Sequence, residues 1–370
     1  MLYSIDFSKK KQDDVEDQID EGYEFELDVD SKRLRKDIQK IIDEAKSGDT
    51  IEFGDLQIEL DKPLEINTEN LTITGLNAKC AKKGKPNELL VVHPSADNFT
   101  LSNCEFEGYG DYDDNRKAFV SIYSNNPHVS NIKGFKGSKD CILICAEHKN
   151  ITAGFVSQIE AMRMGRDTVS LQGCGEDNKF VSGITVDGVK STESEYKGAV
   201  ETSDGSSDNT LRNITYYGKN QEGYAVDVQD HGRRGQTNTN IILFNIKAYD
   251  AEHCIKSANH DFGHSGLTIK NCLAEDCEMP IALSNTDNII LENFLVLDKE
   301  DDDEVRFTFE NCRDITVNSC LVNSKAMDQD AQIDADDDDD EKKNNKKGKC
   351  KKKDKKNKKR DKKKNKKNKK

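Results

Sequence analysis

The chain repeats one short pattern ten times, and this repeat constrains the fold more than any other feature of the sequence. Each copy alternates apolar and polar residues up to an Asn, Gly or Ser, and an apolar residue follows, as in LTITGL at 71–76. We call this Asn, Gly or Ser the corner residue. The ten corner residues are Gly75, Asn103, Asn131, Gly154, Gly183, Asn213, Asn245, Asn271, Asn293 and Ser319. Successive corner residues lie 22 to 32 positions apart.

This repeat predicts a solenoid of short strands. Asn and Gly reach the left-handed backbone conformation at low cost, so the chain can turn a tight corner at that point in every copy. Alternation before the corner is typical of a strand, and the fixed period is typical of stacked coils that contact only their neighbours. A hydrophobic content of 34% is sufficient for such a narrow core. We therefore expect an all-β fold of about ten coils.

A second set of strands is predicted between the corner segments, as in FVSIY at 119–123 and AVDVQ at 225–229. In each of them an apolar residue points inward and the next residue points outward, because strand side chains alternate. We call the outward residues the outer column. They are Ser121, Leu143, Ser170, Glu201, Asp227, Lys256, Ala282 and Thr308.

A helix is predicted at 31–46, just before the first coil. Its apolar residues fall on one stripe at helical spacing, Ser31 suits the N-cap, and SGDT at 47–50 ends it in a turn. An amphipathic helix at this place would cover the open end of a solenoid. The stripe consists of Leu34, Ile38, Ile41, Ile42 and Ala45.

The segments LRKDIQKIIDEAKSGDTIEF at 34–53 and PLEINTENLTITG at 63–75 carry a family resemblance. They resemble the opening of pectate-lyase-like right-handed parallel β-helix proteins, and most of all the alginate and chondroitin lyase branch. The resemblance covers the cap closely and the coils by pattern, including the Asn residues stacked at one corner. It implies a right-handed parallel β-helix with an N-terminal capping helix.

The domain organisation follows from composition. We expect a flexible N-terminus at 1–22, a β-helix domain at 23–326, a disordered acidic segment at 327–341 and a disordered Lys-rich tail at 342–370, because neither terminal segment has enough apolar residues to fold. The tail holds 20 Lys or Arg against two Asp, a charge of +18, so a net charge of −14 leaves −32 on residues 1–341. Such an acidic body is not expected to recognise nucleic acid. The tail is expected to contact polyanions or the acidic body.

The eleven cysteines include no CxxC pair, so we expect buried thiols rather than a zinc site. The first residues, MLYSIDFSKKKQDD, lack the apolar run of a signal peptide, and no later stretch is apolar enough to span a membrane. These features leave the compartment open.

Three charged residues are consecutive in the outer column: Glu201, Asp227 and Lys256. Coils are about 4.8 Å apart, so these side chains should lie within roughly 10 Å of one another on one exterior flank. Polar residues crowd the same region. They are Asp204, Gln229, Asp230, His231, Arg233, Arg234, Asn259 and His260.

The resemblance to polysaccharide lyases implies a chemistry for this region. Metal ligands would be Glu201, Asp227, Asp204 and Asp230, holding Ca²⁺ through oxygen atoms. The cation would neutralise a uronic-acid carboxylate and acidify the proton next to it. The catalytic residues would be Lys256 or His231 as the base and Arg233 at the leaving side. The substrate-binding residues would be Gln229, Arg234, Asn259 and His260. The partner would be an acidic polysaccharide or another glycan.

Other interpretations remain open at this point. The metal-binding Asn and paired Glu of the lyases are not found, and Asn285-Thr286-Asp287 lacks the motifs that follow it in polygalacturonases. The protein is therefore also consistent with a non-enzymatic glycan-binding or surface spike β-helix, or with a polysaccharide hydrolase that uses Asp227 and Asp230 as its acid and base. A solvated network of opposite charges without function is a further alternative.

Overall fold

The computed structural model describes residues 2–5, 23–24, 31–54, 57–81, 88–110, 117–174, 177–232, 237–258, 263–297, 307–323 and 325–326. The acidic segment and the Lys-rich tail lie outside these residues. The coils belong to one compact unit, Met1–Asp336. Its first strand, β1 (Leu2–Ile5), was not predicted and pairs with the first coil through β3 (Thr50–Phe53).

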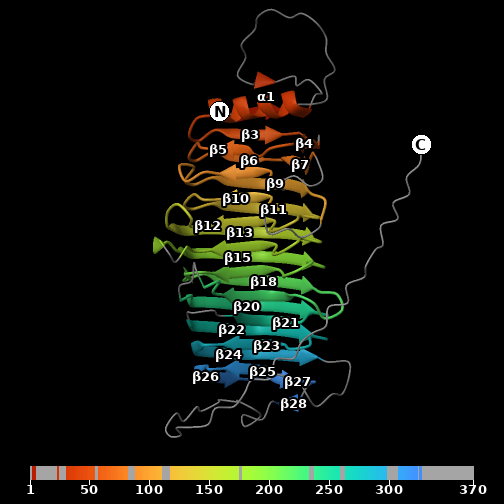
Figure 1. Ribbon diagram of the computed structural model, residues 1–370, viewed down its shortest axis with the longest axis vertical. Coiled ribbons are helices and arrows are strands. Elements are labelled where there is room, and N and C mark those ends of the chain that lie inside the picture. The colour runs from red at the N-terminus through yellow and green to blue at the C-terminus, as the bar shows by residue number, and fades with distance from the viewer. Residues whose placement is uncertain are drawn as a thin grey trace, which may run out of the picture. The chain divides into compact units, whose positions relative to one another are not determined.

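The predicted fold class is confirmed: the described chain is a parallel β-helix of about nine turns, close to the ten expected (Figure 1). One side of every coil belongs to a ten-stranded parallel sheet, which we call the site sheet. In spatial order its strands are β5 (Leu64–Ile66), β8 (Leu90–Val92), β10 (Val120–Ile122), β12 (Ile142–Cys145), β14 (Val169–Gln172), β16 (Val200–Ser203), β19 (Tyr224–Gln229), β21 (His253–Ala258), β23 (Ile281–Ser284) and β25 (Phe307–Glu310).

The rest of each coil belongs to a second sheet of 18 strands, which bends at the corners. Its strands pair in parallel, except that β27 and β28 pair antiparallel at the last coil. Besides β1 and β3 they are β2 (Tyr23–Glu24), β4 (Ile58–Leu60), β6 (Thr72–Thr74), β7 (Asn77–Cys80), β9 (Thr100–Glu107), β11 (His128–Phe135), β13 (Ile151–Met162), β15 (Val181–Thr192), β17 (Ser206–Ser207), β18 (Thr210–Tyr217), β20 (Thr239–Tyr249), β22 (His264–Glu275), β24 (Thr286–Leu297), β26 (Arg313–Asn318), β27 (Leu321–Val322) and β28 (Lys325–Ala326).

The predicted backbone conformation of the corner residues is correct, but two of the ten residues do not belong to the predicted column. All ten predicted corner residues have a positive φ. However, the pairing of Ser130 with Ser157 and of Ile132 with Ile159 places Gln158 opposite the corner residue between them, Asn131. The next member of the corner is then Gly188, with φ 81°. Gly183 instead belongs to a second corner earlier in the coil, where it lies opposite Ala153, and Gly154 is the residue after that corner and pairs with Ile184.

Stacked amides stabilise the predicted corner from coil to coil. Asn131 Nδ2 donates to Asn103 Oδ1 at 2.8 Å, and Asn103 Nδ2 donates to Thr74 Oγ1 at 3.1 Å. Asn245 bonds Asn213 in the same way, at 2.7 Å. This ladder is the physical reason for Asn at a position where Gly would satisfy the backbone alone.

Gly75 shows where the corner demands Gly, and Gly75→Ala is expected to lower the free energy of unfolding by about 2 to 5 kcal/mol. An added Cβ would sit 2.4 Å from the Phe53 carbonyl oxygen, at φ +75°. Gly48→Ala is a matched control, since Gly48 has φ +87° but nothing within 4 Å of its Cβ position. We expect it to cost only the left-handed conformation, about 1 to 2 kcal/mol. Urea unfolding of both variants measures the difference, and equal costs would show that the coil spacing relaxes around the added methyl group.

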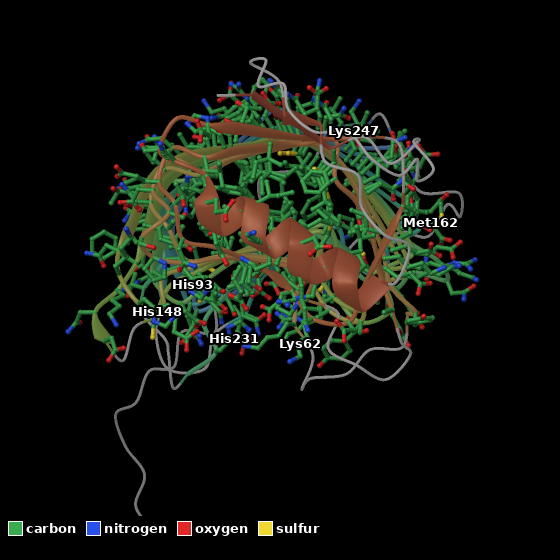
Figure 2. The ribbon with its side chains drawn as sticks, turned by 90° about the horizontal axis from the view of Figure 1, so that it is seen from above. Lys62, His93, His148, Met162, His231 and Lys247 are labelled. Carbon is green, nitrogen blue, oxygen red and sulfur yellow. The ribbon has the colours of Figure 1, made fainter. Side chains whose placement is uncertain are left out.

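The N-terminal helix α1 (Ser31–Glu44) lies across the end of the stack and over its apolar interior (Figure 2). The whole predicted stripe is buried, from Leu34 to Ala45. Polar bonds fix the helix to the first coil: Arg35 Nη2 donates to the Pro63 carbonyl at 2.7 Å, and Gln39 bonds the backbone of Glu65 at 2.9 Å. The end of the solenoid is therefore closed by apolar burial.

Candidate functional site

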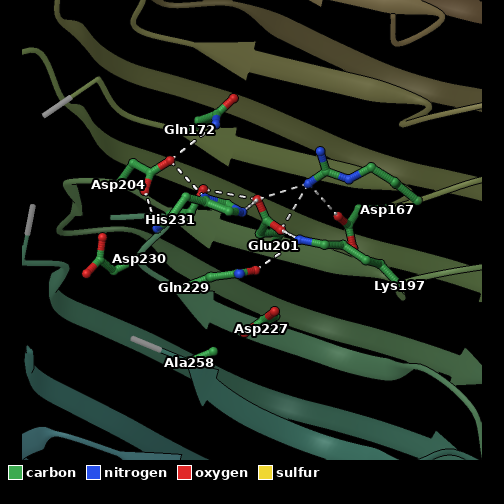
Figure 3. Close-up of polar contacts among 12 residues, drawn as sticks. Asp167, Gln172, Lys197, Glu201, Asp204, Asp227, Gln229, Asp230, His231 and Ala258 are labelled. Carbon is green, nitrogen blue, oxygen red and sulfur yellow. Dashed lines mark hydrogen bonds and ion pairs between the residues drawn. The ribbon is translucent and has the colours of Figure 1, made fainter. Parts of the chain in front are cut away.

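The outer column runs along the face of the site sheet that points away from the apolar core. Strand pairing places Glu201 directly opposite Asp227 and Asp227 directly opposite Lys256, as the alternation predicted. The expected exposure is wrong, because Glu201 and Asp227 are 0% exposed. Arg166 and Lys197 contact the Glu201 carboxylate, and Lys256 lies beside that of Asp227. Figure 3 shows Lys197 next to Glu201.

Glu201, on β16, is held by two cations. Lys197 Nζ donates to it through a short contact, Arg166 Nη2 donates to Oε2 at 3.2 Å, and Ser203 Oγ donates to Oε1 at 3.1 Å. Burial alone would raise the pKa of Glu201, but Lys197 and Arg166 outweigh burial and hold the pKa well below its usual range. Glu201 is therefore ionised at neutral pH.

Asp227, on β19, has the opposite environment. Neither carboxyl oxygen has a hydrogen-bond partner among the described residues. The nearest cation, Lys256 Nζ, lies 3.6 Å from Oδ2. Burial raises the pKa of Asp227, and Lys256 and Lys197 offset this only in part. Two carboxyl groups on adjacent strands thus differ in their tendency to hold a proton.

Asp167 and Tyr224 form a buried support that the sequence did not reveal. Tyr224 donates its hydroxyl to Asp167 Oδ1 at 3.0 Å, and the backbone N–H of Gly198 donates to the same oxygen at 3.2 Å. Burial and the neighbouring charge of Glu201 raise the pKa of Asp167 to about 8. A signal existed, since Asp140 and Asp167 occupy the same repeat position before successive strands and bond each other, Asp167 N to Asp140 Oδ1 at 3.1 Å.

His231 closes the site on the other side. Asp204 Oδ2 lies 2.9 Å from His231 Nδ1 and accepts from Gln172 Nε2 at 3.2 Å, while Asp204 Oδ1 accepts from the His231 N–H at 2.8 Å. Burial by itself would lower the pKa of His231, but Asp204 and Glu201 raise it. Gln229 Oε1 accepts from Lys197 Nζ at 2.9 Å.

Of the residues predicted from sequence, the structure brings together Glu201, Asp204, Asp227, Gln229 and His231 (Figure 3). Lys256 joins them through its ion pair with Asp227. Asp230 is buried nearby, and its Oδ1 accepts from the Gly232 N–H at 2.8 Å. Four predicted residues lie outside the described chain: Arg233, Arg234, Asn259 and His260. Sequence reasoning missed Arg166, Asp167, Lys197 and Tyr224. Of these, Arg166 comes from the connection before β14, and its side chain is 14% exposed.

The carboxylates do not fit a calcium site. Over the described residues, no group of three or more His, Cys, Asp or Glu is arranged to hold a metal ion. Glu201 is already neutralised by Lys197 and Arg166, and Asp204 is bonded by His231. A hard divalent cation needs oxygen ligands that are not engaged by the chain's own cations. We derive no step through a metal.

Asp167→Asn is expected to flatten the pH dependence of stability between about pH 4 and pH 8. The folded state keeps the proton on Asp167 up to about pH 8, whereas the unfolded chain releases it near about pH 3.9. The folded state therefore binds more protons in this interval, and the free energy of unfolding falls as pH rises. Asn cannot titrate, so this slope should disappear from urea midpoints measured across the range. An unchanged slope would mean that Asp167 is ionised in the fold.

Comparisons with known proteins support the fold. No family model and no curated protein sequence matches the chain. Among solved structures, it is similar to PfbA, a surface adhesin of Streptococcus pneumoniae, with TM-score 0.53 and 11% identity over 79% of this chain and 89% of that one. It is also similar to an iota-carrageenase complexed to carrageenan fragments, with TM-score 0.46 and 14% identity over 76% of this chain and 56% of that one. A PL6 alginate lyase complex matches with TM-score 0.41 and 12% identity over 81% and 84%.

These identities show the fold alone, and at that level the resemblance stated from the sequence is confirmed. The chain is a parallel β-helix. Its outer face carries a buried cluster of carboxylates and cations at the middle of the site sheet. No helix within the described ranges is long and apolar enough to cross a membrane.

Proposed function

We propose that this β-helix hydrolyses glycosidic bonds of an acidic polysaccharide at the Glu201–Asp227 pair. The observation that carries the proposal is the pairing, on adjacent strands of one sheet, of a carboxyl group whose pKa is lowered with one whose pKa is raised. Two carboxyl groups whose environments push their pKa values apart are the usual acid and base of glycoside hydrolysis. This assignment replaces Asp230 with Glu201 in the hydrolase interpretation drawn from sequence.

In this mechanism the protonated Asp227 gives its proton to the glycosidic oxygen as the bond from that oxygen to the anomeric carbon breaks. The ionised Glu201 supplies the second carboxylate, either by attacking the anomeric carbon or by taking a proton from the attacking water. Water is consumed and each product chain gains one hydroxyl group. No described residue makes a hydrogen bond to Asp227, so none competes for its acid proton. Because Asp227 is 0% exposed, a neighbouring side chain must move before the glycosidic oxygen can reach it.

The preference for an acidic substrate follows from the side chains that are partly exposed at the site, Lys256 and His231. The carboxyl groups of Glu201 and Asp227 are fully buried, whereas the side chains of Lys256 and His231 are 26% and 29% exposed. A ligand therefore meets cations before carboxylates, which favours a sugar bearing a carboxylate or sulfate group.

Elimination is less well supported. It requires a base to remove the proton next to the uronate carboxylate. Of the two bases expected from the sequence, His231 has a raised pKa, because Asp204 and Glu201 outweigh the effect of burial, so it holds its proton more strongly than a free imidazole.

A second candidate is glycan binding without turnover. It is favoured by one observation: three donors already engage Glu201, from Lys197, Arg166 and Ser203. A carboxylate held in this way is a weaker nucleophile than a free one. Binding of an acidic glycan would then be the whole function of the cluster.

The test is product analysis. The full chain is incubated with polygalacturonate, alginate and a sulfated galactan, and both reducing ends and unsaturated-product absorbance are followed. Hydrolysis gives new reducing ends without that absorbance. Equal growth of both signals would establish elimination instead, and binding in a sedimentation assay with neither signal would establish the second candidate. No turnover and no binding would reject both.

A further inference from the structure

Tyr224 is an uncharged residue that contacts two charged groups of the cluster, Asp167 and Lys256. It lies on β19, three residues before Asp227, and is 2% exposed. Its hydroxyl bonds Asp167, and its ring lies under the ammonium group of Lys256, with Nζ 4.6 Å from the ring centroid. Tyr224 therefore links Asp167 to Lys256.

We propose that Tyr224 is a positioning residue that holds the Lys256 ammonium at the surface of the cluster, where its N–H groups bind the anionic group of the ligand. This inference rests on the proposed function only in taking the ligand to be acidic. It adds the residue that recognises the anion and the residue that fixes it in place.

Lys256 differs from the other lysine of the cluster. Lys197 uses its donors within the protein, on Glu201 and on Gln229 at 2.9 Å. Lys256 Nζ lies 3.6 Å from Asp227 Oδ2, an ion pair too long for a hydrogen bond, and its other contact among the described residues is the Tyr224 ring. A partly exposed ammonium group with unused donors is suited to bind a carboxylate or sulfate.

The ring of Tyr224 can hold Lys256 because the ring itself is fixed. Its hydroxyl donates to Asp167 Oδ1, and Asp167 is anchored in turn by the Gly198 N–H at 3.2 Å and lies 3.7 Å from Arg166 Nη2. A Lys side chain otherwise loses considerable rotamer freedom when it binds a ligand. A cation placed over an aromatic face has already lost part of this freedom, and the contact itself corresponds to about a 3- to 30-fold effect on binding.

The direct test uses inorganic sulfate as the probe and needs no identified substrate. The Lys256 side-chain signal is followed by NMR while sodium sulfate is titrated at constant ionic strength. We expect a saturable shift in the wild type and about 3- to 30-fold weaker binding in Tyr224→Leu. Tyr224→Phe keeps the ring but loses the hydroxyl bond that fixes it to Asp167, so its sulfate affinity should fall between those of the wild type and Tyr224→Leu. Lys247, which lies on the opposite side of the coil from His231 (Figure 2), is the control signal and should not saturate.

Two results would overturn the inference: no saturable shift of Lys256 in the wild type, or unchanged sulfate affinity in Tyr224→Leu. The titration involves no turnover, so it stands even if hydrolysis is not found.

A binding readout on the acidic polysaccharide complements the titration. Lys256→Met and Tyr224→Leu should each weaken binding, or raise KM more than they lower kcat, and the double variant should bind no worse than Lys256→Met alone, because Tyr224 acts through Lys256. Tyr224→Phe, which keeps the ring but not the bond to Asp167, should lie between the wild type and Tyr224→Leu. A double variant whose losses add would show that Tyr224 supports the fold in general, and that result also counts against the inference.

Discussion

Asp227→Asn is expected to lower kcat by about 10²- to 10⁴-fold on an acidic polysaccharide, the usual contribution of a general acid. Asn has the shape of a protonated Asp but cannot give up a proton. The fold should not suffer, because burial already opposes the charged form of Asp227 and its oxygens accept no hydrogen bond from a described residue. Reducing-end assays and thermal unfolding at neutral pH measure both effects.

Asp187→Asn is the matched control for this variant. Asp187 lies on β15 of the other sheet and pairs with Arg212 at 2.8 Å, so the same chemical change is made away from the site. It should leave kcat unchanged. Full activity in Asp227→Asn would remove Asp227 from the mechanism, and an Asp227→Asn variant that fails to fold would contradict the account of its burial.

Glu201→Gln is expected to destabilise the protein by about 3 to 5 kcal/mol, in addition to abolishing turnover. The change leaves Lys197 without its carboxylate partner and Arg166 without one of its three, although both side chains are mostly buried, at 11% and 14% exposed. Because the pKa of Glu201 is lowered in the fold, its contribution to stability is present above about pH 4.3 and is lost as pH falls toward the folded-state pKa. Urea unfolding at neutral and acidic pH measures this loss.

The control for Glu201→Gln is a double variant that also removes one of the two cations left without the Glu201 carboxylate. Glu201→Gln with Lys197→Met should recover part of the lost stability, because two buried partners removed together cost less than one removed alone. A single variant within about 1 kcal/mol of the wild type would place Glu201 among the weak ion pairs typical of surfaces. The site would then be solvated, contrary to its burial.

Much of the fold could be predicted because the backbone imposes a corner residue on every coil. The left-handed conformation needed at Asn103, Asn131 and Asn213 restricts the residue type strongly enough to be visible in one sequence. The two errors, at Gly154 and Gly183, arose because each coil has more than one such corner. Gln158 has the same conformation, with φ 53°, although Gln rarely adopts it, so the true member of the corner was overlooked.

The register of the candidate site followed from the strand period alone. Alternation fixes which residues of a strand share a face, so Glu201, Asp227 and Lys256 could be aligned without coordinates. The burial of this column could not be foreseen. It depends on Arg166 and Lys197, which come from the connections before β14 and β16, and the conformation of a connection is not set by any period.

The stacked architecture also sets how this protein can change length. The charged groups around Glu201 come from four successive coils, which contain β14, β16, β19 and β21. Each coil contacts only its neighbours in the stack. Whole turns gained or lost near either terminus would lengthen or shorten the molecule while the cluster kept its internal distances. A single turn inserted between β16 and β19 would part Glu201 from Asp227 by one further strand spacing. The number of coils can therefore change near either terminus, but not between the strands that carry the cluster.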